Sequence, residues 1–143
     1  MKIGVTGTRA GMSDYQYINV MKGLKHLKRK HEELELHHGD CIGVDVQIAS
    51  MARDLGIKVV SHPPVKETLR AFHDSDIILN PDSYLSRDRR IVDSVDMLIV
   101  VPKDKKSDFM DDTKSGTKYT HDYAKKIGRT KVIFYPQPKI TEA

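Results

Sequence analysis

The chain has 143 residues, of which 38% are hydrophobic and 31% are charged, and its formal net charge is +4. This composition predicts one soluble, compact domain with its own core, and no apolar run approaches the roughly 20 residues that a membrane-spanning helix needs. The first residues read as a strand rather than a signal peptide. Cys41 is the single cysteine, which excludes an internal disulfide and predicts a reducing, cytoplasmic compartment. The basic charge suits an anionic ligand.

The N-terminal half alternates between apolar strands and amphipathic helices. Strands are predicted at residues 2–6, 34–38 and 57–61, because short apolar runs end there in glycine or proline. Ser13 can cap the first helix. Apolar residues at helical spacing define its inward face: Tyr17, Val20, Leu24 and Leu27. The order strand, helix, strand, helix, strand predicts parallel pairing with right-handed crossovers.

The second half continues the alternation after a less regular middle. We expect a short helix over 66–74, and a brief strand or buried turn over 77–79. A helix over 84–95 should turn Leu85, Ile91 and Val95 inward. A strand over 96–101 and a polar loop over 103–114 follow, then a helix that buries Tyr123, Ala124 and Ile127, and a last strand over 131–135. The whole predicts an α/β fold: a single Rossmann-like doubly wound domain over 1–136, with a mainly parallel central sheet flanked by helices, and a short tail over 137–143.

Three loops that join a strand to a helix contain glycine, and we expect them to meet. They include Gly7-Thr8-Arg9, the segment from Gly39 to Gly43, and Ser115-Gly116-Thr117. In a doubly wound sheet, ligands bind beyond the carboxyl ends of the strands, where the strand order reverses. With the usual order, the first and fourth core strands are neighbours there. Unpaired N–H groups at a helix start attract anions, so the loops predict a phosphate-binding site.

The candidate ligand-binding residues are those of the three loops and of the arginine-rich helix start. They are Gly7, Thr8, Arg9, Gly39, Asp40, Gly43, Arg87, Arg89, Arg90, Ser115, Gly116, Thr117 and Thr120. One of the three arginines should face the crevice. Asp40 is placed to bind a ribose hydroxyl, whereas Asp45 is expected to hold the loop by accepting hydrogen bonds from backbone N–H groups. Thr120 either faces the ligand or bonds backward to its own helix.

Several site classes are excluded by motif spacing. The glycines lack the G-x-G-x-x-G spacing, which argues against NAD or FAD redox chemistry, and there is no Walker A sequence either. The histidines lack metal-ligand spacing, so we predict no metal site and no resident cofactor; a Mg²⁺ ion brought by a phosphate ligand stays open. Cys41 has no histidine placed by sequence to activate it, and lone cysteines are more often small buried hydrophobes.

Taken together, four motifs resemble the SLOG superfamily, which includes the Lonely Guy phosphoribohydrolases, the YspA-like proteins and the Rossmann core of DNA-processing protein A. Gly7-Thr8-Arg9 is similar to the family's Gly-Ser/Thr-Arg turn, and the segment 38–45 to its Gly-Gly-Ala-x-Gly-hydrophobic-Asp motif. The segment 87–92 resembles its arginine-rich helix start. Ser115-Gly116-Thr117-x-x-Thr120, with Ala124 and Gly128-Arg129, resembles its final element.

The resemblance implies binding, sensing or processing of nucleotides and their derivatives. We expect a sensor, carrier or sponge that binds a nucleotide-derived phosphorylated ligand. One alternative is a nucleotide or nucleoside N-glycosidase that uses Asp40 or Asp45. Thr120 stands where the phosphoribohydrolases carry a required glutamate, which argues against an enzyme. Another alternative is single-stranded nucleic-acid binding, as in the DNA-processing proteins. Relatives are commonly dimers or larger, which implies a homo-oligomer.

Overall fold

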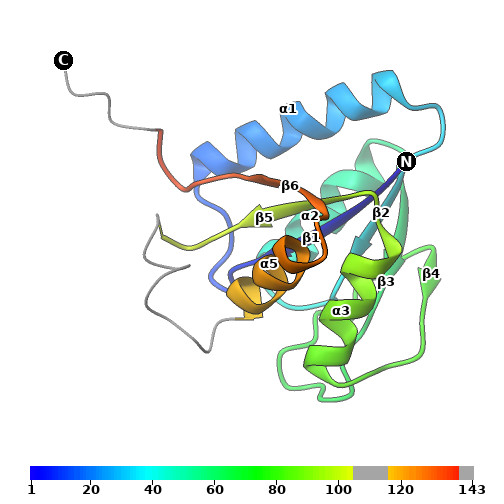
Figure 1. Cartoon of the computed structure of the whole chain (residues 1–143). Helices are drawn as coiled ribbons and strands as arrows, with labels where there is room; N and C mark the ends of the chain where they lie inside the picture. Colours follow the sequence, from blue (N-terminus) through cyan, green and yellow to red (C-terminus); the bar gives the residue numbers. More distant parts are fainter. Residues whose placement is uncertain (105–115, 139–143) are drawn as a thin grey trace.

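The computed structural model describes residues 1–104 and 116–138, and these form a layered α/β structure (Figure 1). In chain order the elements are β1 (Lys2–Gly7), α1 (Asp14–Lys30), β2 (Glu35–His38), α2 (Val44–Asp54), β3 (Lys58–Ser61), β4 (Ile77–Ile78), α3 (Tyr84–Ser94), β5 (Met97–Val101), α5 (Gly116–Lys126) and β6 (Thr130–Ile133). The six strands found in this part of the chain make one sheet, ordered β4-β3-β2-β1-β5-β6. Every neighbouring pair is parallel.

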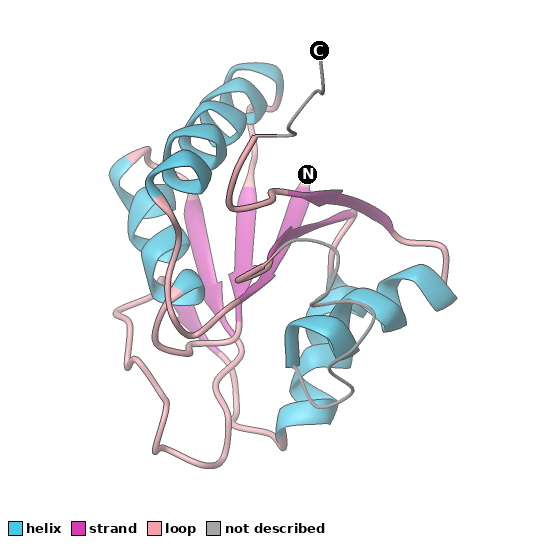
Figure 2. Cartoon of the chain, turned by 90° about the vertical axis from the view of Figure 1, so that its left-hand side faces the viewer, coloured by secondary structure: helices cyan, strands magenta, loops and turns pink. Residues whose placement is uncertain are grey.

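The predicted Rossmann-like arrangement is confirmed. Helices α1 and α2 cover one face of the sheet, and α3 and α5 cover the other (Figure 2). Each face has its own apolar core. The larger joins Val20 and Leu24 of α1 and Ile48 of α2 to the central strands, and the smaller joins Ile91 of α3 and Ala124 of α5 to β5. None of the helices in the described part of the chain is long and apolar enough to cross a membrane.

Helix α1 begins at a capping box, as the position of Ser13 predicted. The Ser13 hydroxyl accepts from the Gln16 backbone N–H at 3.1 Å, and the Gln16 side chain accepts from the Ser13 N–H at 3.0 Å. The predicted inward face was wrong at Tyr17, which is 45% exposed. Gln16 is buried instead, because its amide donates to two carbonyls, those of Pro102 and Phe134, each at 2.8 Å. In the first turn of α1, hydrogen bonds therefore bury Gln16 in place of Tyr17, whereas Val20 and Leu24 are buried as predicted.

The predicted helix over 66–74 is also wrong. These residues, all within the described part of the chain, form turns and extended chain. Their backbone also bonds to the loop between β2 and α2: the Ala71 N–H donates to the Asp40 carbonyl at 2.7 Å, and the His73 N–H donates to the Asp40 carboxylate at 2.9 Å. The strand over 77–79 exists as β4, at the sheet edge, with both isoleucines exposed.

Two further predicted core positions, besides Tyr17, are exposed. Leu85 is 51% exposed, because Arg87 and Asp88 take the inward positions of α3 beside Ile91. Ile127 is 41% exposed, since it follows the last residue of α5. Ile91, Val95 and Ala124 are buried, as predicted.

Candidate functional site

A cavity of about 480 Å³ lies at the carboxyl ends of the central strands. Its walls come from the end of β1, the β2–α2 loop, the start of α3 and the start of α5. Gly7 at the end of β1 lies opposite Val101 at the end of β5, so the predicted neighbours at the switch point are confirmed. A second hollow of about 450 Å³ lies at the other end of the sheet, between exposed charges of both signs. Only the first brings together the glycine-bearing loops.

The turn after β1 is packed tightly against α2. The Thr8 N–H donates to the Val101 carbonyl at 3.0 Å, and the Thr8 hydroxyl accepts from the Ala10 N–H at 3.1 Å. A Cβ atom on Gly7 would lie 2.4 Å from a methyl carbon of Val44. Gly7 is therefore required for helix packing, besides lining the cavity with Thr8 and Arg9.

Gly43 is required by the loop backbone. Its φ of +89° lies in a region that side-chain-bearing residues avoid, and an added Cβ would lie 2.5 Å from the Arg9 carbonyl oxygen. Gly43 is the residue before α2. The next residue, Val44, donates its backbone N–H to the Thr8 carbonyl, and this hydrogen bond joins the loop to the turn after β1.

We expect Gly43→Ala to lower the free energy of unfolding by about 3 kcal/mol, because the new methyl group meets backbone atoms that cannot move aside. Urea denaturation followed by circular dichroism measures the loss. Gly116→Ala is the control, since a methyl group added there would meet no non-neighbouring atom of the described residues within 4 Å. Equal effects of the two changes would contradict the assigned role of Gly43.

Asp45 holds the β2–α2 loop, as predicted. Its Oδ2 accepts from the N–H groups of Gly39 and Cys41, at 3.1 and 3.3 Å. Burial raises the pKa of Asp45 to about 6, although Arg87 and the two N–H groups act in the opposite direction. The same side chain lines the cavity. Asp45 therefore presents a carboxyl group that titrates close to neutral pH.

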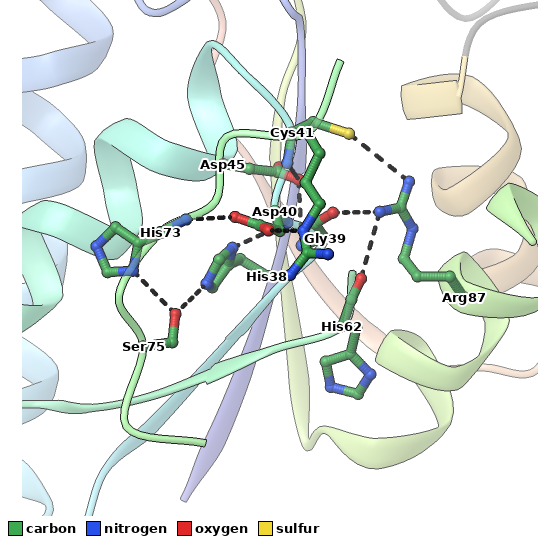
Figure 3. A network of polar contacts seen from close by, with 10 residues as sticks. His38, Gly39, Asp40, Cys41, Asp45, His62, His73, Ser75 and Arg87 are labelled. Carbon is green, nitrogen blue, oxygen red and sulfur yellow. Dashed lines mark hydrogen bonds and ion pairs between the residues drawn. The ribbon is translucent and has the colours of Figure 1, made fainter. Parts of the chain in front are cut away.

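Of the three arginines of α3, Arg87 is the one that lines the cavity, and its polar contacts are drawn in Figure 3. It is 5% exposed, and its guanidinium reaches from α3 toward the β2–α2 loop. Nε donates to Asp88 Oδ1 at 2.7 Å, and Nη1 donates to the carbonyls of Gly39 and His62. Burial lowers the pKa of Arg87, but Asp88, Cys41 and Asp45 outweigh burial and raise it above its usual value, so the group stays charged.

Two further side chains show what the cavity lining can do chemically. Burial raises the pKa of the Cys41 thiol, which keeps the sulfur protonated and disfavours a nucleophilic role. Burial also raises the pKa of Asp88, against the effects of Arg87 and the Thr120 hydroxyl. Sequence reasoning missed Asp88, although its place next to Arg87 at a helix start was a usable signal.

The start of α5 forms the opposite wall. Gly116, Thr117 and Thr120 line the cavity, and the Thr120 hydroxyl donates to the Gly116 carbonyl at 2.8 Å. Thr120 thus bonds backward to its helix and also faces the cavity. Ser115 lies outside the described residues.

Four candidates lie away from the cavity lining. Arg89 donates to the Tyr119 hydroxyl at 2.7 Å, and Arg90 donates to His62 Nδ1 at 3.0 Å. Gly43 serves the backbone of its loop. Asp40 is fully buried, and its carboxylate accepts from Arg70 Nε at 2.8 Å and from the His73 N–H. Asp40 is therefore a tie between the loop and the segment 66–74.

We expect Asp40→Asn to destabilise the fold by about 3 kcal/mol, because it removes the charge that pairs with partly buried Arg70. Asparagine tolerates the φ of +55° found at this position, so the backbone is retained. Thermal unfolding measures the loss. A variant as stable as the wild type would contradict the structural role of this carboxylate.

The charges around the cavity are mixed. Arg9, Arg87 and Lys103 contribute positive charge, and Asp45 and Asp88 contribute carboxyl groups. In the described ranges, 1–104 and 116–138, no cluster of three or more histidine, cysteine or acidic residues has a geometry that could hold a metal ion.

When the chain is compared with known proteins, only solved structures match it. No protein-family model matches the sequence, and no curated protein is similar to it. The molybdenum cofactor carrier protein from Chlamydomonas reinhardtii has a TM-score of 0.65 and 22% identity, over 96% of this chain and 77% of the other. The molybdenum cofactor binding protein from Rippkaea orientalis has a TM-score of 0.67 and 19% identity, over 92% and 74%.

DNA processing protein A from Helicobacter pylori, described by its single-stranded DNA binding mode, has a TM-score of 0.63 and 18% identity, over 93% of this chain and 64% of the other. The chain shares the fold of these proteins. It spans about half of DNA processing protein A from Streptococcus pneumoniae, covering 49% of that chain. At these identities, the likeness concerns the fold.

Proposed function

We propose that the cavity binds a nucleotide-derived, phosphorylated small molecule, and that the protein acts as a sensor, carrier or sponge for it. The observation that carries the proposal is the charged, nearly buried Arg87, which lines the same cavity as the start of α5. A buried guanidinium and a helix N-terminus both favour an anion. Arg9 and Lys103 add positive charge at the same cavity.

The remaining lining suits the organic part of such a ligand. Tyr84, Leu85 and Ile91 supply apolar and aromatic surface on the α3 side, against which a planar base can pack. Asp45 supplies a carboxylate that can accept a hydrogen bond from a ribose hydroxyl. The volume of about 480 Å³ is in the usual range for small-molecule sites. Similar structures named for carrying or binding the molybdenum cofactor support a small ligand.

A depletion-and-release assay tests the proposal. Excess protein is incubated with mononucleotides, cyclic nucleotides, ADP-ribose derivatives, the molybdenum cofactor and a single-stranded oligonucleotide. The protein is then retained on a filter and denatured by heat, and every compound is quantified by chromatography. Depletion of one small phosphorylated compound, with its intact return, is the expected result. Depletion of none of the small compounds would refute the proposed function.

Arg9→Gln tests the position of the phosphate. Arg9 is exposed, so its replacement should leave the fold intact. The loss of one charge-assisted hydrogen bond should weaken binding by about tenfold, close to 1.4 kcal/mol. Isothermal titration with the ligand that the assay identifies measures the change. Arg89→Gln is the matched control. Arg89 does not line the cavity, so this variant should bind the ligand with wild-type affinity.

A hydrolase is the second candidate, because two carboxyl groups with raised pKa values line one cavity. Asp88 interacts with Thr120, where the phosphoribohydrolases carry their glutamate, so a carboxyl group is available near that position. A carboxyl group whose pKa is raised by burial is better suited to act as a general acid than an ordinary one. Return of the ligand as free base and sugar phosphate would establish this candidate. Asp88→Asn should then abolish cleavage and retain binding.

A further inference from the structure

A chain of four side chains, Glu35, His37, His62 and Arg90, connects α3 to the two neighbouring strands β2 and β3. Arg90 Nε lies 3.0 Å from His62 Nδ1, His62 Nε2 lies 2.7 Å from His37 Nδ1, and His37 Nε2 lies 2.8 Å from Glu35 Oε1. Both imidazole rings are buried, with 5% exposure at His37 and none at His62. The cavity does not use these groups.

Only one arrangement of hydrogens satisfies all three contacts. Arg90 Nε always carries a hydrogen, so His62 Nδ1 must accept. His62 then carries its proton on Nε2 and donates to His37, and His37 donates from Nε2 to Glu35. A proton added to either imidazole places two N–H donors opposite each other. The two donors are those of Arg90 and His62 or those of His62 and His37. The chain therefore holds α3 only while both histidines are neutral.

The surrounding charges act against protonation. Arg87 and Arg90 face the pair from α3, Lys58 from β3 and Lys2 from β1, whereas Glu35 is the one carboxylate that faces it within the described residues. Arg90 Nη2 is buried and has no hydrogen-bond partner in that same part of the chain. The His62 carbonyl also accepts a hydrogen bond from Arg87 Nη1. His62 therefore binds α3 through two of its arginines, Arg87 and Arg90.

We propose that the Glu35–His37–His62–Arg90 chain is an acid-sensitive latch, which docks α3 on the sheet at neutral pH and releases it when one histidine takes up a proton. Helix α3 carries Tyr84, Arg87 and Asp88 to the cavity, so release would dismantle that wall. This consequence for the ligand rests on the proposed function, whereas the docking of α3 does not.

Hydrogen exchange of the α3 amides tests the latch without any ligand. With an ordinary histidine pKa of about 6.5 in the released state, one proton should raise the opening constant of α3 about thirtyfold between pH 7.5 and pH 5.0, after correction for the intrinsic exchange rates. Arg90→Gln should remove most of this rise, because an amide at position 90 can accept from a protonated ring as well as donate to a neutral one. Arg89→Gln should keep the full rise.

An opening constant that is independent of pH, or an undiminished rise in Arg90→Gln, would overturn the latch. Nitrogen-15 spectra of the wild-type histidines give a second test that needs no variant, and both rings should carry the proton on Nε2 at pH 7.5. A proton on Nδ1 of either ring would contradict the hydrogen-bond order. The double variant His37→Gln/His62→Gln should lose the thirtyfold rise in the corrected opening constant of α3, and a rise of the wild-type size there would also overturn the proposal.

Discussion

Replacing Arg87 by methionine is expected to abolish ligand binding and to lower the free energy of unfolding by about 3 to 5 kcal/mol. The guanidinium pairs with Asp88 and satisfies the carbonyls of Gly39 and His62. Removal leaves a buried carboxylate and two carbonyls without these partners. Methionine fills much of the volume, so the loss reports the polar contacts rather than a void.

Binding and stability can be separated with a second change. Arg87→Met combined with Asp88→Asn removes the unpaired charge and should regain about 2 kcal/mol of the stability lost by Arg87→Met. It should not regain affinity, because the positive charge in the cavity is still missing. Urea denaturation and ligand titration measure the two quantities. Arg89→Gln should leave the affinity unchanged, and wild-type affinity in Arg87→Met would show that the ligand lies elsewhere.

Acidification is the second change with a large expected effect. Burial lowers the pKa values of His38 and His62 to about 3, so the unfolded chain takes up protons below its pKa of about 6.5 while the folded protein does not. Stability is therefore full above pH 6.5 and is lost as the pH falls toward 3. Between pH 7 and pH 5, these two histidines should account for a loss of about 4 kcal/mol.

Asp45 acts in the opposite direction over the same range. Burial raises its pKa to about 6, so the folded protein takes up this proton first and gains about 1.3 kcal/mol between pH 7 and pH 5. The net contribution of His38, His62 and Asp45 is a loss of about 2.5 kcal/mol, and urea denaturation at the two pH values measures the change. Replacement of exposed His26 by glutamine should leave the loss unchanged. A protein as stable at pH 5 as at pH 7 would contradict the neutral, buried state of the histidines.

Sequence patterns predicted the fold well, because they report on backbone periodicity and turns. The alternation of strands and helices led to the parallel sheet, and the glycines at strand ends marked the three loops. Gly7 and Arg87, from distant parts of the chain, line one cavity, as the convergence of the loops predicted. The choice among Arg87, Arg89 and Arg90 could not be made, since it depends on the rotation of α3 against the sheet.

The errors share a physical cause. Hydrophobic periodicity assigns polar side chains to the surface, whereas Gln16, Asp40 and Asp88 are buried through specific hydrogen bonds. Each partner lies far away in the sequence or on another element, except for Arg87 beside Asp88. The segment 66–74 was assigned to a helix for a related reason: its backbone partner is Asp40, about thirty residues earlier, and no local pattern reveals that pairing.

The position of β1 has a consequence for the order of folding. Its residues pair with β2, which follows α1 directly, and also with β5, where Ile3 lies opposite Met97. Loop closure over such a separation is slow, so we expect the β1–β2–β3 half to form first and β5 to dock last. The cavity lies at the carboxyl ends of β1 and β5, where the two parts of the sheet meet. A ligand should therefore bind only chains that have completed the slow step, and should slow unfolding without speeding folding.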